Sequence, residues 1–228
     1  MASTYLKRGA ISTPTNNTKG TFSCWFKRGN FTNQTLFCGG TDVGVQSNTK
    51  DMRIYIASSG TTLNFYQDDY NVTGNNTWNF PALIRDTAAW YHLVVAIDTT
   101  QSANADKVKF YLNGNLLTAS SISATESFTN LFFNTSGLYQ IIGVYNYGTS
   151  NYFDGCMSHI HFTDGYVYDA SAFGSTDATT GEWKINTSPN VTYGNNGFFI
   201  LKDSNSVTDQ SPNTNNFTVS GGTLTSTV

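Results

Sequence analysis

Short runs of β-branched and aromatic residues, separated by turn-forming residues, recur along the whole chain of 228 residues. Runs of this kind predict β-strands, and their close spacing is typical of a sandwich or barrel. The predicted strands are Thr21–Arg28, Gln34–Cys38, Met52–Ile56, Thr62–Gln67, Tyr91–Asp98, Lys107–Leu112, Asn115–Leu117, Tyr139–Val144, Met157–Thr163, Gly197–Lys202 and Asn216–Ser220. The pattern therefore predicts an all-β fold.

One hairpin is marked clearly within this pattern. Apolar and polar residues alternate on both sides of the pair Asn113-Gly114. Asn-Gly is a preferred sequence for a two-residue turn in which both central residues take positive φ. We therefore expect a tight β-hairpin centred on this pair.

The amino-acid usage favours strands over helices. The chain has 33 Thr, 25 Asn and 22 Ser, against 12 Leu and two Glu. Helical surfaces favour Leu and Glu, whereas strands and turns favour Thr, Asn and Ser. One short helical turn is expected at Ala170–Phe173, where Asp169 can cap the first turn and Gly174 can end it.

No shift in composition marks a domain boundary. Residues 204–216 are almost entirely Ser, Asn, Thr, Asp and Pro, which predicts a polar loop, and the residues after it predict a final strand. We therefore expect one domain over residues 1–228, large enough to bury a core without disulfides or metal.

Charge and hydropathy exclude two classes of partner. Charged residues make up 12% of the chain and the net charge is -3, so the basic field of a nucleic-acid-binding protein is absent. The longest apolar run, Leu93–Ile97, is far shorter than the roughly 20 residues that span a bilayer. No apolar stretch follows the basic pair Lys7-Arg8, so we expect no signal peptide, no membrane insertion and synthesis in a cytoplasm.

The three cysteines are Cys24, Cys38 and Cys156, and no Cys-x-x-Cys pair occurs. Their odd number and wide spacing favour buried free thiols over zinc or redox chemistry. A Cys24–Cys38 disulfide is the alternative, because both side chains could face one core.

Two stretches resemble a known family. Trp90 and His92 precede an apolar strand, and the hairpin Lys109–Gly114 follows after a polar insertion; Phe153–Ile160 is similar to a later strand. This arrangement resembles laminin-G-like domains of the concanavalin A-like lectin and glucanase superfamily. The resemblance implies a jelly-roll-type antiparallel β-sandwich, in agreement with the predicted strands.

The flanking segments are similar to a narrower version of this domain, found in structural proteins of marine tailed phages and related viruses. The segments concerned are Tyr5–Arg8, Thr21–Gly29, Asp164-Gly165, Ser171–Gly174 and Gly194–Phe198.

That resemblance implies a non-enzymatic protein on the virion surface, as a capsid decoration, collar or tail fibre component. Its partners would be other virion proteins, further copies of itself, and host cell-surface glycans in host adsorption. The alternative is a free-standing polysaccharide-binding lectin or a bacterial adhesin module. The sequence does not distinguish head from tail.

Catalytic chemistry has little support in the sequence. Most glycosidases need two carboxyl groups facing one cleft, and the hydrolases of this superfamily resemble one another in carrying two Glu and an Asp on one strand. Glu126 and Glu182 lie far apart and in no such strand. His159 and His161 share a predicted strand face, but with His92 expected to be structural they lack a third metal ligand. We therefore assign no catalytic residues.

Calcium is the one cofactor that the resemblance suggests, although none is required. Lectin-like domains often bind Ca²⁺ at a sandwich rim through Asp, Asn and backbone carbonyls. The 13 Asp and many loop Asn are too numerous to single out metal ligands.

Glycan binding is the main functional hypothesis. Sugar sites combine an aromatic face with a few amide or carboxylate groups. Trp25 and Trp90 are expected in the core. The candidate glycan-contact residues are Tyr66, Asp68, Asp69, Tyr70, Trp78, Tyr145 and Tyr147.

Overall fold

The protein is described from a computed structural model that covers residues 3–45, 49–125, 127–147 and 150–226. The strands of the larger sheet are β1 (Tyr5–Arg8), β3 (Gln34–Gly40), β4 (Lys50–Ile56), β5 (Thr62–Asp69), β6 (Asn76–Pro81), β10 (Ser121–Ala124), β11 (Tyr139–Ile142) and β16 (Thr218–Ser220). Those of the smaller sheet are β2 (Lys19–Arg28), β7 (Tyr91–Asp98), β8 (Val108–Leu112), β9 (Asn115–Leu116), β12 (Gly155–Asp164) and β15 (Phe198–Ile200). The remaining elements are the hairpin β13 (Gly174–Thr176) and β14 (Trp183–Ile185), α1 (Asn104–Lys107), and the 3₁₀ turns η1 (Phe132–Asn134) and η2 (Ala170–Ala172).

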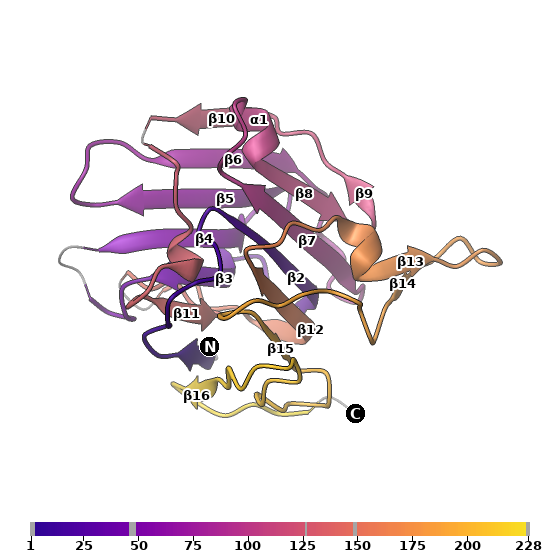
Figure 1. Ribbon diagram of the computed structural model, residues 1–228. Coiled ribbons are helices and arrows are strands. Elements are labelled where there is room, and N and C mark those ends of the chain that lie inside the picture. The colour runs from indigo at the N-terminus through magenta and orange to yellow at the C-terminus, as the bar shows by residue number, and fades with distance from the viewer. Residues whose placement is uncertain (1–2, 46–48, 126, 148–149, 227–228) are drawn as a thin grey trace.

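Two antiparallel sheets face each other to form a β-sandwich (Figure 1). The larger sheet has the order β10-β6-β5-β4-β3-β11-β1-β16, and the smaller has the order β15-β12-β2-β7-β8-β9. The prediction of an all-β antiparallel sandwich is confirmed. No helix in the described part of the chain is long and apolar enough to cross a membrane.

The core lies between the two sheets and is rich in aromatic rings. Phe37 of β3 stacks on Phe22 of β2, with ring centroids 4.8 Å apart, and on Phe133 of η1 at 4.5 Å. Side chains of a strand alternate between its two faces, so every second residue of β2, β4 and β5 enters this core. The alternate residues of β4 and β5 are left on the outer face of the larger sheet.

The sequence signals for two local structures are confirmed. Asn113 and Gly114 join β8 to β9 with φ of 48° and 82°. The Asp169 side chain accepts a hydrogen bond from the Ser171 amide at the start of η2, as an N-cap should.

Residues after β12 cover the outer face of the smaller sheet. Phe173 packs on Val94 there, and Trp183 donates a hydrogen bond from Nε1 to His92 Nδ1 at 2.8 Å. His92 Nε2 lies 2.9 Å from the Ser23 hydroxyl, so both ring nitrogens are occupied within the protein. His92 therefore has a structural role, as expected.

A β-bulge interrupts β12 between Ser158 and His161. His159 takes a positive φ of 47° at the bulge, yet it shares a face with His161 as predicted, because the rings of His159 and His161 lie 5.7 Å and 3.9 Å from that of Phe199. His161 is buried and its Nδ1 lies 2.9 Å from the Tyr193 hydroxyl. In the part of the chain that the structure describes, no three His, Cys, Asp or Glu side chains are grouped to hold a metal ion.

One expectation about buried residues was wrong, and the alternative of a Cys24–Cys38 disulfide is not borne out. Trp90 is 42% exposed, because it precedes β7 rather than entering its buried face. Cys24 faces the core between the sheets, whereas Cys38 faces the outer side of the larger sheet, so the two thiols cannot share one core. All three cysteines are free.

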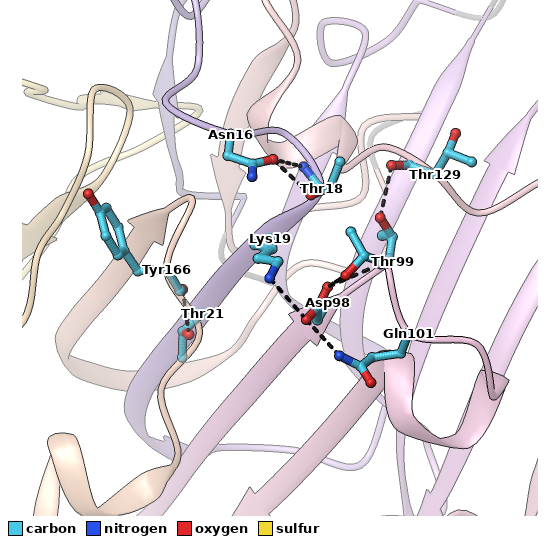
Figure 2. Close-up of polar contacts among 10 residues, drawn as sticks. Asn16, Thr18, Lys19, Thr21, Asp98, Thr99, Gln101, Thr129 and Tyr166 are labelled. Carbon is cyan, nitrogen blue, oxygen red and sulfur yellow. Dashed lines mark hydrogen bonds and ion pairs between the residues drawn. The ribbon is translucent and has the colours of Figure 1, made fainter.

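Polar contacts join distant segments at one end of the sandwich (Figure 2). Lys19 at the start of β2 lies 3.3 Å from the carboxylate of Asp98 at the end of β7. The Thr99 hydroxyl donates to the Thr129 carbonyl at 2.9 Å, which connects the loop after β7 to the segment before η1.

The polar segment predicted at residues 204–216 is a loop organised around one carboxylate. Asp209 accepts hydrogen bonds from the backbone amides of Phe199, Ser211 and Asn215, each at 2.8 or 2.9 Å. The chain then enters β16, which pairs with β1 at the edge of the larger sheet. The composition thus predicted a loop, and a buried acceptor gives it a fixed shape.

Candidate functional site

The outer face of the larger sheet carries a cluster of aromatic and acidic side chains at β4 and β5. The residues of β4 that alternate with its core residues are Asp51, Arg53 and Tyr55. In the antiparallel register Asp51 lies opposite Asp68 of β5, and Arg53 lies opposite Tyr66. Because facing residues of paired strands lie side by side, this register places two acids next to a cation and a ring.

Arg53 is at the centre of the cluster and is surrounded by tyrosine rings. Its guanidinium carbon lies 3.8 Å from the ring centroid of Tyr145, 4.6 Å from that of Tyr66 and 5.1 Å from that of Tyr55. Cation–π contacts of this kind are favourable within about 6 Å. The side chain of Arg53 is only 15% exposed, so it serves mainly as the support on which the rings rest.

The exposed Tyr70 and the half-buried Tyr147 form the rim of the cluster. Their rings are stacked, with centroids 5.1 Å apart and planes 6° from parallel, and Tyr70 is 44% exposed. The hydroxyls of Tyr70 and Tyr145 lie 3.1 Å apart, and the Tyr66 hydroxyl donates to Asp68 Oδ2 at 2.8 Å. We call the set Tyr55, Tyr66, Asp68, Tyr70, Tyr145 and Tyr147, with Arg53 at its centre, the tyrosine patch.

Asp51 forms a buried floor beneath the patch. Its carboxylate is fully buried 3.5 Å from Arg53 Nε, and Cys38 Sγ lies 3.7 Å from its other oxygen. Burial raises the pKa of Asp51 to about 7, although the charge of Arg53 acts in the opposite direction. Asn146 closes the floor by donating to the carbonyls of Thr41 and Lys50.

The phenols of Tyr66 and Tyr145 stay protonated at neutral pH. Burial, and then the hydrogen bond to Asp68, raises the pKa of Tyr66 well above its ordinary value. Burial and the nearby charge of Asp51 raise the pKa of Tyr145 likewise. The patch therefore offers neutral hydroxyls, ring faces and one carboxylate, which are the groups that hydrogen-bond and stack with sugars.

The structure brings together five of the seven residues that the sequence singled out: Tyr66, Asp68, Tyr70, Tyr145 and Tyr147. Asp69 instead points to the other face of β5 and pairs with Lys50. Trp78 is fully buried, where it packs against Phe65 and donates from its indole nitrogen to the Asn104 carbonyl. Trp78 is therefore not available to a ligand on this surface.

Sequence reasoning missed Arg53, Asp51 and Tyr55. Their signal was present in the alternation Asp51-x-Arg53-x-Tyr55, which places three polar or aromatic side chains on one face of a strand whose other face is apolar. The pairing of this strand with β5, which brings them to Tyr66 and Asp68, became visible only in the fold.

A separate pocket of about 470 Å³ opens between the edges of the two sheets. Leu6, Phe153 and Met157 form part of its wall, and the exposed Trp90 and Cys156 also line it. It offers a second place where a small molecule could be held, and variants can distinguish it from the tyrosine patch.

Of the two glutamates, only Glu182 lies in the described part of the chain. Glu182 is exposed in the β13–β14 hairpin, which projects from the body of the sandwich (Figure 1). Glu126 lies outside the described residues.

The fold is similar to several solved lectin-like structures. A heptameric pentraxin from Limulus polyphemus is 15% identical, with 96% of this chain and 86% of that chain covered and a TM-score of 0.55. The CBM40 module of the Ruminococcus gnavus IT-sialidase, solved with α2,3-sialyllactose, is 16% identical over 73% of this chain and 94% of that chain, with a TM-score of 0.51. The leech intramolecular trans-sialidase is 16% identical over 72% of this chain and 26% of that chain, with a TM-score of 0.52.

At these identities the likeness concerns the fold alone. No match to a curated protein sequence was found. A family model described as the concanavalin A-like lectin/glucanases superfamily matches residues 2–170, about three quarters of the chain. This match covers more than half of the chain and agrees with the two-sheet sandwich. The chain therefore belongs to the concanavalin A-like lectin/glucanases superfamily.

Proposed function

We propose that this chain is a non-enzymatic glycan-binding protein that contacts saccharides through the tyrosine patch. The observation that carries the proposal is the group of stacked, partly exposed tyrosines beside a carboxylate on the outer face of the larger sheet. Stacked rings accept the C–H face of a sugar, and Asp68 accepts hydrogen bonds from its hydroxyls. The fold belongs to a superfamily of lectin-like proteins, which supports this use of the surface.

Asp51 and Asp68 are the carboxyl groups that a catalytic role would have to use. They face each other across β4 and β5, and the raised pKa of Asp51 is a property that glycosidase acids share. Asp51, however, is fully buried beneath Arg53 and Asn146 and cannot touch a glycosidic oxygen at the surface. A binding role is therefore the better proposal.

We further propose that the protein is displayed on the surface of a phage or virus particle, with other virion proteins as its partners. Support comes from the flanking segments that resemble virion structural proteins, among them Thr21–Gly29 and Gly194–Phe198. Many copies on one particle would strengthen weak glycan contacts by avidity. Antibody labelling of purified particles would separate this location from a free lectin or a bacterial adhesin module.

Binding of the purified protein to a glycan array and to intact bacterial cells tests the function, once with Ca²⁺ and once with a chelator. We expect binding to defined saccharides under both conditions, because the patch acts through its own side chains. Binding lost on chelation would instead point to a calcium site at the rim of the sandwich. No binding by folded protein would contradict glycan recognition and leave a structural role in the particle.

A further inference from the structure

The tyrosine patch carries information about the charge of its ligand. We propose that it selects uncharged saccharides and discriminates against acidic ones such as sialylated or uronic-acid glycans, an inference that rests on the proposed function.

The only cation at the centre of the patch, among the described residues, is already engaged. Arg53 lies 3.5 Å from the Asp51 carboxylate, and its guanidinium is covered by the rings of Tyr145 and Tyr66. A ligand carboxylate normally binds Arg through two parallel hydrogen bonds to an open edge of the guanidinium. The side chain of Arg53 is only 15% exposed, so little of the guanidinium is open to such a ligand.

The other outward cation of the larger sheet is also paired. The strands of this sheet contain Lys7, Arg8, Lys50 and Arg53. Arg8 points inward to Gln140, and Lys50 pairs with Asp69 on the inner side. Lys7 remains on the outer face, where its ammonium lies 3.0 Å from Asp42.

Asp68 adds a negative charge at the place where a sugar hydroxyl would bind. One of its oxygens accepts the Tyr66 hydroxyl at 2.8 Å, and the residue is 8% exposed, so its carboxylate is partly shielded from water. A carboxylate accepts hydrogen bonds and cannot donate them. It therefore favours a ligand that presents hydroxyls and repels one that presents a second carboxylate nearby.

The remaining contact is indifferent to charge. The partly exposed stack of Tyr70 and Tyr147 offers a flat ring face of the kind that packs against the C–H side of a hexose. The patch thus combines apolar stacking with a hydroxyl acceptor, and it provides no free cation for an acidic group.

Matched pairs of glycans test the proposal. Lactose and sialyllactose, and further neutral oligosaccharides with their uronic-acid counterparts, are titrated into the wild-type protein at pH 8. We expect the neutral member to bind at least about tenfold more tightly at low salt. Raising the salt to about 1 M should reduce the ratio of neutral to acidic affinity, because the Debye length falls to about 3 Å and the repulsion is screened. The affinity for neutral glycans should not change.

Asp68→Asn is the informative variant, and Asp203→Asn is its control, because Asp203 is an exposed aspartate in the loop after β15. Asp68→Asn should weaken neutral binding about tenfold, as expected for a lost hydrogen bond to a charged group, and should reduce the preference for neutral ligands. Asp203→Asn changes the net charge by the same amount, and it should alter neither the affinity for neutral glycans nor the preference for them.

Equal or tighter binding of the acidic members would overturn the charge selection while leaving glycan binding intact. Binding of neither class would overturn the proposed function and this inference with it. The salt titration uses wild-type protein, so the test stands even if Asp68→Asn does not fold.

Discussion

At the scale of single residues, the outer face of the larger sheet is organised by one buried charge pair. Asp51 and Arg53 are two residues apart on β4, and both are largely removed from water. Removing one partner from a buried pair leaves the other uncompensated, which is more costly than the pair itself. Burial disfavours the charged form of Asp51, so its pKa is raised from 3.8 to about 7.

The raised pKa gives a prediction for stability against pH. Between about pH 4 and pH 7 the folded chain binds more protons at Asp51 than the unfolded chain does, so this group's contribution to the free energy of unfolding falls as pH rises. Asp51→Asn removes the ionisation. Whatever the constant cost of leaving Arg53 without its partner, we expect the difference in the free energy of unfolding to move in favour of the variant by about 2–3 kcal/mol as pH rises from 5 to 8.

Urea denaturation of both proteins across this range is the measurement. His92, whose pKa is lowered by burial to about 3, acts in the opposite direction, but it is present in both proteins and cancels in their difference. A difference that stays constant with pH would show that Asp51 does not titrate in this window.

The sequence predicted the candidate site in part. Tyr66, Asp68 and Tyr145 could be selected because aromatic and acidic residues in or beside turns are typical of sugar sites. Trp78 was selected for the same reason and is buried, because a strand in a polar segment, β6, had not been predicted. Arg53 shares one strand face with Asp51 and Tyr55, but its contacts with Tyr66 and Tyr145 come from other segments, so its central place became visible only in the fold.

At the scale of elements, the turn between β8 and β9 also positions a neighbouring element. A Cβ atom on Gly114 would lie 2.5 Å from two ring carbons of Trp183, the residue that opens β14 and bonds to His92. Gly137 has the same φ of +82°, and a Cβ there would meet nothing within 4 Å. The two glycines therefore separate backbone strain from crowding.

We expect Gly137→Ala to lower the free energy of unfolding by about 1–2 kcal/mol, the cost of left-handed backbone for an L-residue. Gly114→Ala should cost about 1–3 kcal/mol more, because the Trp183 ring must also move. Denaturant melts of the two variants measure the difference. Equal losses would show that the β13–β14 hairpin does not pack firmly on the turn.

Strand prediction succeeded where one face of the strand is apolar. Tyr91–Asp98 was predicted with the bounds that β7 has in the structure. Among the strands that were not predicted, β6 and β10 are rich in Asn, Ser and Thr, residues that also favour turns. They form because β6 pairs with β5 and β10 pairs with β6. Local propensity could not reveal this pairing between distant segments.

At the scale of the whole molecule, the C-terminal region belongs to the same core as the matched family region. The family match ends at residue 170, yet Phe198, Ile200 and Phe217 are buried in the main core. The ring of Phe217 lies 4.7 Å from that of Phe198, and β16 completes the larger sheet beside β1. We therefore propose that the polar segment before Phe217 is a connection within one folded unit.

Phe217→Ala tests this view, with Phe31→Ala as the control because Phe31 is 49% exposed. Removing a buried aromatic ring costs about 3–5 kcal/mol, so we expect a loss of that size for Phe217→Ala. The control should lose less than about 1 kcal/mol. Similar losses in both variants would mean that the C-terminal region does not share the core.

Saccharide binding at the tyrosine patch is tested by calorimetry. The best-bound neutral oligosaccharide is titrated into three variants. Tyr147→Ala removes a half-buried ring of the patch, Tyr166→Ala removes an exposed ring beside the smaller sheet, and Trp90→Ala alters the separate pocket. We expect Tyr147→Ala to lose at least about tenfold in affinity, roughly 1.4 kcal/mol. The other two variants should bind as wild type does. Unchanged binding by folded Tyr147→Ala, with the loss found in Trp90→Ala, would contradict binding at the patch and place the ligand in the pocket between the sheets.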